Sequence, residues 1–95
     1  MVNISDADYQ ICKLLIEYTD LESRMQAATQ TYARSGNMGD VLRALQTDAS
    51  QIKQEVERIY AETYGIVQPF GNLQAQYAGV VNYVRNGEVE RKAKL

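Results

Sequence analysis

Apolar residues recur at alternating steps of three and four along most of this chain, in two runs separated by one short polar break. The first run begins at Ile4 and ends at Tyr32, and the second begins at Leu42 and ends at Thr63. A mean step of about 3.5 residues is typical of helices that pack against other helices. The break, residues 35–40, contains two glycines and favours a turn. The pattern predicts an antiparallel helical hairpin.

Start and stop signals set the expected helix boundaries. We expect helices over about residues 5–34, 40–64 and 70–86. Ser5 suits the N-cap of the first helix, because its hydroxyl can accept the amide of Asp8, whose carboxylate can reach back to Ser5. Asp6 and Asp8 also suit the positive end of the helix dipole, and we expect no further role for either. Glycines at positions 65 and 87 end the second and third helices.

The third helix needs an apolar partner, and the N-terminal half of the first helix offers one. A second apolar stripe lies there, off the main run: Tyr9, Cys12 and Ile16. We therefore expect a single all-α domain over residues 1–95, a coiled-coil-like three-helix bundle in which the shorter third helix runs along that stripe. Residues 21–55 would form a bare two-helix arm, and the charged tail, residues 88–95, would fray.

Charged residues suggest one register for the hairpin. Folding about the centre of the turn places Glu22 opposite Lys53, and Arg24 between Asp48 and Glu55. Antiparallel coiled coils pair such edge positions, and each exposed pair contributes about 0.2–1 kcal/mol. Both edges are complementary in this register.

Composition excludes several classes of function. The chain has no histidine, which removes imidazole bases, the usual zinc sets and Glu-x-x-His iron sites. Cys12 is the single cysteine, and we interpret it as a packing residue in a reducing compartment. A net charge of −2 gives no field for nucleic acid, and the basic cluster at 91–94 lies beside acidic residues. We expect no enzyme, cofactor, metal, nucleic acid or membrane span, no secretory signal, and a cytoplasmic location.

An acidic stripe runs along one edge of the second helix. Asp48, Glu55 and Glu62 recur every seven residues. We interpret them as ordinary solvent-facing positions near Arg24, and the alternative is a surface for a cation or a basic partner.

Tyrosine is unusually frequent, with seven residues against one phenylalanine. Its ring is apolar while its hydroxyl needs water or a partner, so it suits half-buried surfaces and protein interfaces. An equally weighted interpretation is that the tyrosines cover the solvent-exposed end of a small bundle. Met38, at the tip of the turn, is a further contact candidate. The candidate interface residues are Tyr9, Tyr18, Tyr60, Tyr64, Tyr77 and Met38.

In length and hairpin format the chain resembles the secreted helical-hairpin proteins whose turn carries a Trp-x-Gly motif. Here the turn, residues 35–40, holds no tryptophan. The export motif of that family is Tyr-x-x-x-Asp/Glu, whereas Tyr83 is followed by Gly87 at the fourth position and Glu88 at the fifth. Neither motif is present, and the resemblance assigns no family.

These observations favour a small helical protein–protein interaction module, such as an adaptor, chaperone, inhibitor or structural subunit. We expect a protein partner and also self-association, since the seam edge with Val41, Met38 and Ala27 could accept a second hairpin as a four-helix arm. One alternative is a ligand- or pigment-binding bundle that uses the tyrosine-rich end. Another is a helical-hairpin protein secreted without a signal peptide.

Overall fold

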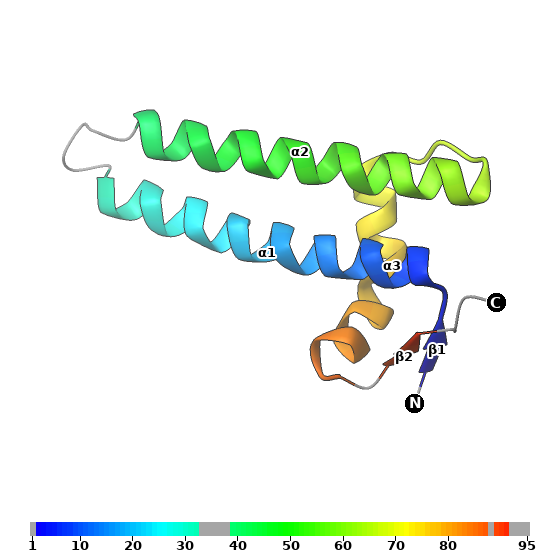
Figure 1. Ribbon diagram of the computed structural model, residues 1–95. Coiled ribbons are helices and arrows are strands. Elements are labelled where there is room, and N and C mark those ends of the chain that lie inside the picture. The colour runs from blue at the N-terminus through cyan, green and yellow to red at the C-terminus, as the bar shows by residue number, and fades with distance from the viewer. Residues whose placement is uncertain (1, 33–38, 88, 92–95) are drawn as a thin grey trace.

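The computed structural model describes residues 2–32, 39–87 and 89–91. Within that part of the chain the helices are α1 (Asp6–Tyr32), α2 (Gly39–Tyr64) and α3 (Phe70–Arg85), and the strands are β1 (Val2–Ile4) and β2 (Val89–Arg91) (Figure 1). The expected helical hairpin with a shorter third helix on α1 is confirmed. No helix in the described residues is both long and apolar enough to cross a membrane.

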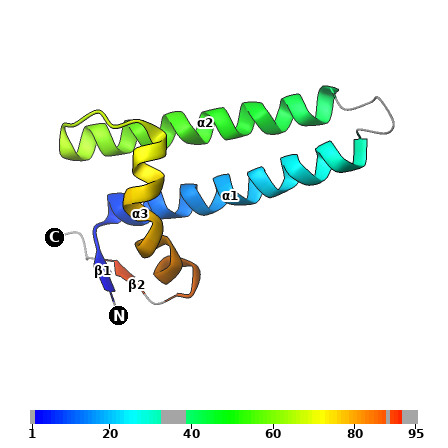
Figure 2. The same cartoon turned by 180° about the vertical axis from the view of Figure 1, so that it is seen from behind.

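The molecule is elongated, at 53 × 28 × 21 Å, because the two long helices extend beyond the third. α1 and α2 lie side by side and antiparallel over their whole length, and α3 covers one end of the pair (Figure 2). The other end has no covering element among the described residues. The expected two-helix arm is therefore present.

The helix ends follow the local signals. Ser5 is the cap of α1, since its Oγ accepts a hydrogen bond of 3.1 Å from the backbone amide of Asp8. α2 ends where Gly65 takes a φ of 69°, and the Gly65 amide donates to the carbonyl of Ala61 at 2.8 Å. A left-handed residue at this position is the usual way to close a helix, and glycine adopts it at little cost.

α3 begins with a cap supplied by another helix. Pro69 precedes it in an extended conformation and offers no side-chain acceptor. Instead, a carboxylate oxygen of Glu57 in α2 accepts the amide of Phe70 at 2.9 Å. The first orphan amide of α3 is thereby satisfied from α2, which fixes where α3 starts its return across the hairpin.

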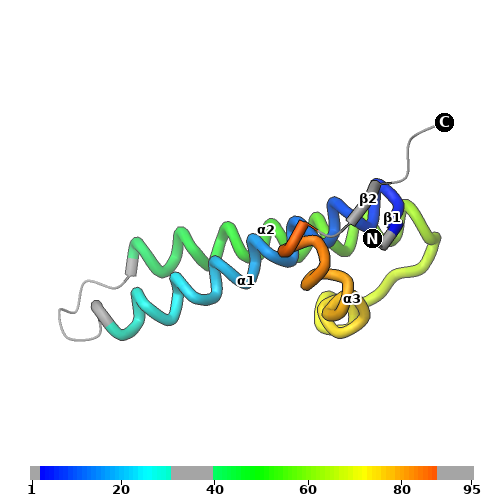
Figure 3. The backbone as a smooth tube through the Cα atoms, turned by 90° about the horizontal axis from the view of Figure 1, so that it is seen from below, coloured from blue at the N-terminus to red at the C-terminus, as the bar shows by residue number. Residues whose placement is uncertain are grey.

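α3 does not run along α1 as expected but crosses the hairpin steeply, so that its first turns are seen nearly end-on in Figure 3. The core at this crossing is one cluster of buried side chains: Ile11, Cys12, Leu15, Val56, Ile59, Tyr60, Phe70, Leu73 and Tyr77. Cys12 belongs to it as expected. The other α1 contributions are Ile11 and Leu15, while Tyr9 and Ile16 are only partly buried. A crossing helix needs a compact patch of α1, not a stripe along it.

The two chain ends pair, which the sequence did not predict. β1 and β2 form a parallel two-stranded sheet in which Val2 is opposite Val89 and Ile4 is opposite Arg91 (Figure 1). Ile4 is buried at this junction. Residues 89–91 of the expected fraying tail are therefore ordered by backbone hydrogen bonding, while residue 88 and residues 92–95 lie outside the described part.

The side chain of Lys53 lies beside two aromatic rings rather than beside the acid that the charges suggested. The ammonium of Lys53 lies 5.6 Å from the ring centroid of Tyr18 and 5.8 Å from that of Phe70. Tyr18 is about one helical turn before Glu22, the expected partner. Among the described residues no ion pair joins Glu22 to Lys53. The aromatic faces offer the cation a site worth about 0.5–1 kcal/mol, comparable to an exposed ion pair.

Candidate functional site

Three helices meet at one carboxylate, that of Asp8 in the first turn of α1. Its Oδ1 accepts hydrogen bonds from the hydroxyls of Tyr64, at the end of α2, and Tyr77, in the middle of α3, both at 2.6 Å. These short distances are typical of hydrogen bonds to an ionised acceptor. The role of Asp8 therefore goes beyond the dipole interaction expected from the sequence, and its carboxylate turns to the tyrosines rather than only capping the helix.

The surroundings of the two hydroxyls keep them protonated. Burial raises the pKa of Tyr77 well above its usual value, and the hydrogen bond to Asp8 and its negative charge add to that rise. The pKa of Tyr64 is also raised, first by burial and then by the same carboxylate. A tyrosine with a raised pKa stays protonated at neutral pH, so its hydroxyl donates a hydrogen bond and supplies no phenolate base. The Asp8 cluster is thus suited to holding helices together rather than to proton transfer.

The tyrosines expected at an interface fall into different environments. Tyr60 and Tyr77 are 7% and 6% exposed and belong to the core, where their rings meet edge to face with centroids 6.4 Å apart. Tyr64 is 43% exposed and stacks at a tilt on Tyr60, with centroids 4.7 Å apart. Of these three, Tyr64 presents its ring to solvent, so it is the one available to a partner.

The remaining candidates lie elsewhere. Tyr18 is half-buried against Phe70, with ring centroids 4.7 Å apart, beneath Lys53. Tyr9 lines a groove between α1 and α2. Met38 lies outside the described residues. The structure therefore does not bring the six candidates together as one patch, and their part in binding stays a prediction.

Cys12 has the environment of a packing residue. Its side chain is fully buried in the core between α1 and α3. Burial raises the pKa of its thiol from 9.0 to about 11, and the charge of Asp8 contributes to the rise. Because the thiolate is the reactive form, this thiol is a poor nucleophile near neutral pH.

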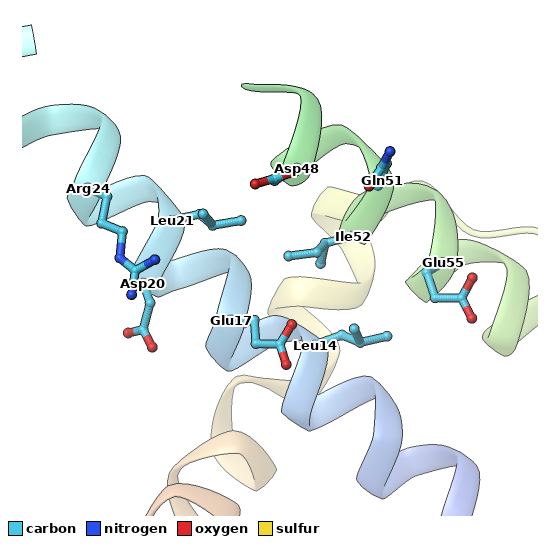
Figure 4. A pocket seen from close by; sticks show the side chains of 9 residues that line it. All are labelled: Leu14, Glu17, Asp20, Leu21, Arg24, Asp48, Gln51, Ile52 and Glu55. Atoms are coloured by element: carbon cyan, nitrogen blue, oxygen red, sulfur yellow. The ribbon is translucent and has the colours of Figure 1, made fainter. Parts of the chain in front are cut away.

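A groove runs between α1 and α2, and α3 crosses behind it in the view of Figure 4. Its volume is about 590 Å³, and Leu21 and Ile52 point toward each other across it (Figure 4). Leu14 completes the apolar floor. Carboxylates stand along both edges, from Glu17 and Asp20 on α1 and from Asp48 and Glu55 on α2. An apolar floor between polar edges is the usual form of a groove that binds a helix.

The groove continues toward the bundle end. A second hollow of about 440 Å³ shares Leu14 and Glu55 with the first and extends to Tyr9, Lys13 and Ile59. On α1 the combined lining runs from Tyr9 to Arg24, about 22 Å at the helical rise. That length matches about four turns of a helix.

The three residues of the acidic stripe expected on α2 do not all lie in the groove. Asp48 and Glu55 line the groove, whereas Glu62 does not. Arg58 bonds to both Glu55 and Glu62 along the outer face of α2, at 2.7 Å to Glu62. The hydrogen bond from Arg58 lowers the pKa of Glu55 and keeps it ionised. Arg24 extends along α1 toward Asp20 rather than across the groove (Figure 4).

Sequence reasoning missed the α1 side of this groove and the role of Asp8. Glu17 and Asp20 show no heptad repeat, so only the pairing of α1 with α2 brings them into one groove with Asp48.

Three or more potential metal ligands do not gather anywhere in the described part of the chain. The groove is a shaped surface with charged edges. Comparison with protein-family models, with curated proteins and with solved structures finds no match for this chain.

Proposed function

We propose that the chain is a non-enzymatic helical module that binds a protein partner through its two-helix arm. One observation carries the proposal: several large side chains of the apolar seam stay half-buried along the arm, although Leu21, Ala28 and Ala49 there are buried. Ile11, Val56 and Ile59 at the bundle end are at most 9% exposed. Other arm positions of the same seam remain partly accessible: Met25, Leu42, Leu45 and Ile52.

A half-buried seam favours a covering partner on energetic grounds. Each square ångström of apolar surface removed from water contributes about 25 cal/mol, so completing the burial of several such side chains contributes several kcal/mol to association. Val41 is 43% exposed one heptad before Asp48, and therefore extends the apolar surface toward the tip of the arm. The bundle end supports the non-enzymatic part of the proposal. The raised pKa values of Tyr77 and Cys12 keep both groups protonated near neutral pH, so neither is a ready base or nucleophile.

Affinity capture from the native host, with matched variants, tests this proposal. Leu45→Asn places a polar group on the arm seam, and Val67→Asn makes the same kind of change at a side chain that is 86% exposed beside the bundle. We expect a specific partner to be captured by the wild type and by Val67→Asn and to be lost with Leu45→Asn. A turnover-dependent activity that Glu55→Gln abolishes while folding and binding persist would contradict the proposal.

A second copy of the chain is a second candidate for the covering partner, since the exposed Val41 lies on the seam edge expected to accept another hairpin. Sedimentation measures this directly. A four-helix arm should give a dimer that Leu45→Asn converts to monomer, whereas a concentration-independent monomer mass would exclude self-association as the function of the arm.

A further inference from the structure

The groove between α1 and α2 spans part of the bundle end and part of the arm, and it carries charged side chains along its edges. Its two hollows share Leu14 and Glu55, so they adjoin along the hairpin between Ile59 and Asp48. Apolar side chains supply the floor along this path: Leu14, Leu21, Ile52 and Ile59. An amphipathic helix could lay one apolar face on such a floor.

The edges of the groove carry an excess of negative charge. Four carboxylates line it, from Glu17, Asp20, Asp48 and Glu55, against the two lining cations Lys13 and Arg24. Arg58, outside the groove, is bonded to Glu55, so Glu17, Asp20 and Asp48 carry the excess charge. Within the described residues, no ion pair joins Glu17 or Asp48 to a basic side chain. These carboxylates come from both helices that line the apolar floor, where a helix seated in the groove would carry its flanking side chains.

We infer that this groove binds an amphipathic helix of a protein partner whose apolar stripe is flanked by lysine or arginine. The inference rests on the proposed function and names the chemistry of the partner. Apolar contacts would supply most of the affinity, while the two acidic edges would orient the helix and exclude acidic partners. The length of the groove corresponds to a segment of about 15 residues.

A second copy of this chain fits the groove poorly. α1 contains five acidic and two basic residues, and α2 contains five acidic and three basic residues. Either long helix would therefore place carboxylates against the acidic edges. α3 contains a single charged residue, Arg85, and part of its apolar face is already used in the core. Charge complementarity thus favours a partner other than this chain.

A panel of three synthetic helices of about 16 residues tests the inference. All three carry the same leucine stripe and a fluorophore, and their flanking positions are lysine, glutamine or glutamate. We expect fluorescence anisotropy to show the lysine peptide binding at least about tenfold more tightly than the glutamine peptide, and the glutamate peptide not binding. Raising the salt from about 50 mM to about 500 mM should remove most of that difference, because exposed charges are screened.

Matched variants locate the binding site. Glu17→Gln with Asp48→Asn removes two charges from facing edges of the groove, and should weaken the lysine peptide by about three- to tenfold. Glu22→Gln with Asp40→Asn removes two exposed charges that do not line the groove, and should leave binding within about twofold. Circular dichroism and urea unfolding of both double variants show whether each remains folded.

The outcomes separate this inference from the proposed function. Equal binding of the lysine and glutamine peptides, both weakened by Ile52→Asn on the groove floor, would overturn the basic partner and leave the arm as a binding surface. Equal weakening by the two double variants would also overturn it, since it would show attraction to net charge alone. A stable dimer that excludes the peptides would overturn it in favour of a second copy. Loss of affinity confined to the groove variant would establish the inference.

Discussion

The hydroxyl of Tyr77 in α3 donates a 2.6 Å hydrogen bond to Oδ1 of Asp8 in the first turn of α1, 69 residues earlier in the chain. This bond reaches from the middle of the crossing helix to the start of the hairpin. Tyr64 donates to the same oxygen from the end of α2. The carboxylate also lies in the first turn of α1, at the positive end of the helix dipole. One side chain therefore holds all three helices at the end opposite the arm.

Removing this acceptor should destabilise the bundle. Asp8→Ala leaves the largely buried Tyr77 hydroxyl without its partner, and we expect it to lower the free energy of unfolding by about 1–3 kcal/mol. Asp40→Ala is the matched control, because Asp40 is an exposed acid in the first turn of α2. Its loss should cost about 0.3–1 kcal/mol. Urea unfolding measures both, and equal losses would show that Asp8 acts only through the helix dipole.

The two tyrosines should differ in what their hydroxyls contribute. Tyr77 is 6% exposed and Tyr64 is 43% exposed, so water can replace the acceptor of Tyr64 more readily. We expect Tyr77→Phe to cost about 1 kcal/mol and Tyr64→Phe to cost less. A double-mutant cycle of each with Asp8→Ala isolates the coupling. A larger coupling for Tyr64 would contradict the geometry of the cluster.

Packing should be tighter at the bundle end than along the arm. Leu73 is fully buried at the centre of the core, while Leu45 is partly accessible on the arm. We expect Leu73→Ala to cost about 2–5 kcal/mol, as for a fully buried leucine, and Leu45→Ala to cost clearly less. Thermal and urea unfolding check the order. If Leu45→Ala were the more damaging change, the arm rather than the bundle end would be the stable core.

The buried thiol makes stability depend on pH in the alkaline range. The pKa of Cys12 rises from 9.0 to about 11 on folding, so the folded state keeps a proton that the unfolded state has lost between those values. This stabilising effect is complete below pH 9 and is lost as the pH rises toward 11, with a magnitude on the order of 2 kcal/mol.

Comparison of the wild type with Cys12→Ala isolates that effect. Tyr77 and Tyr64 also have raised pKa values and weaken both proteins in the same direction. The free energy of unfolding of the wild type should therefore fall more steeply with pH than that of Cys12→Ala. Parallel slopes would mean that the thiol titrates normally in the folded chain.

Local signals predicted most of the helical architecture. Ser5 and Gly65 mark helix ends because their chemistry acts on neighbouring backbone groups, and the three-and-four spacing reports which face of each helix is buried. The direction of α3 could not be read in this way, because it depends on the cap that Glu57 supplies from α2. The pairing of β1 with β2 joins two three-residue segments, which are too short to show a periodic pattern.

The site was predicted only in part, for the same reason. Asp48 and Glu55 were visible as a heptad repeat, while Glu17 and Asp20 become groove residues only when α1 and α2 pair. Tyrosine frequency pointed to the end of the bundle where Tyr60, Tyr64 and Tyr77 lie but did not separate buried from exposed rings. The acceptor for Tyr77 lies 69 residues away, beyond any local pattern.

Hydrogen–deuterium exchange of the chain bound to its captured partner tests the central claim, that the arm is the binding surface. We expect the partner to slow exchange in residues 14–24 of α1 and 48–55 of α2, which line the groove, and to leave the connector at residues 65–69 unchanged. Slower exchange confined to that connector and to Tyr64, with no change along the arm, would contradict the claim.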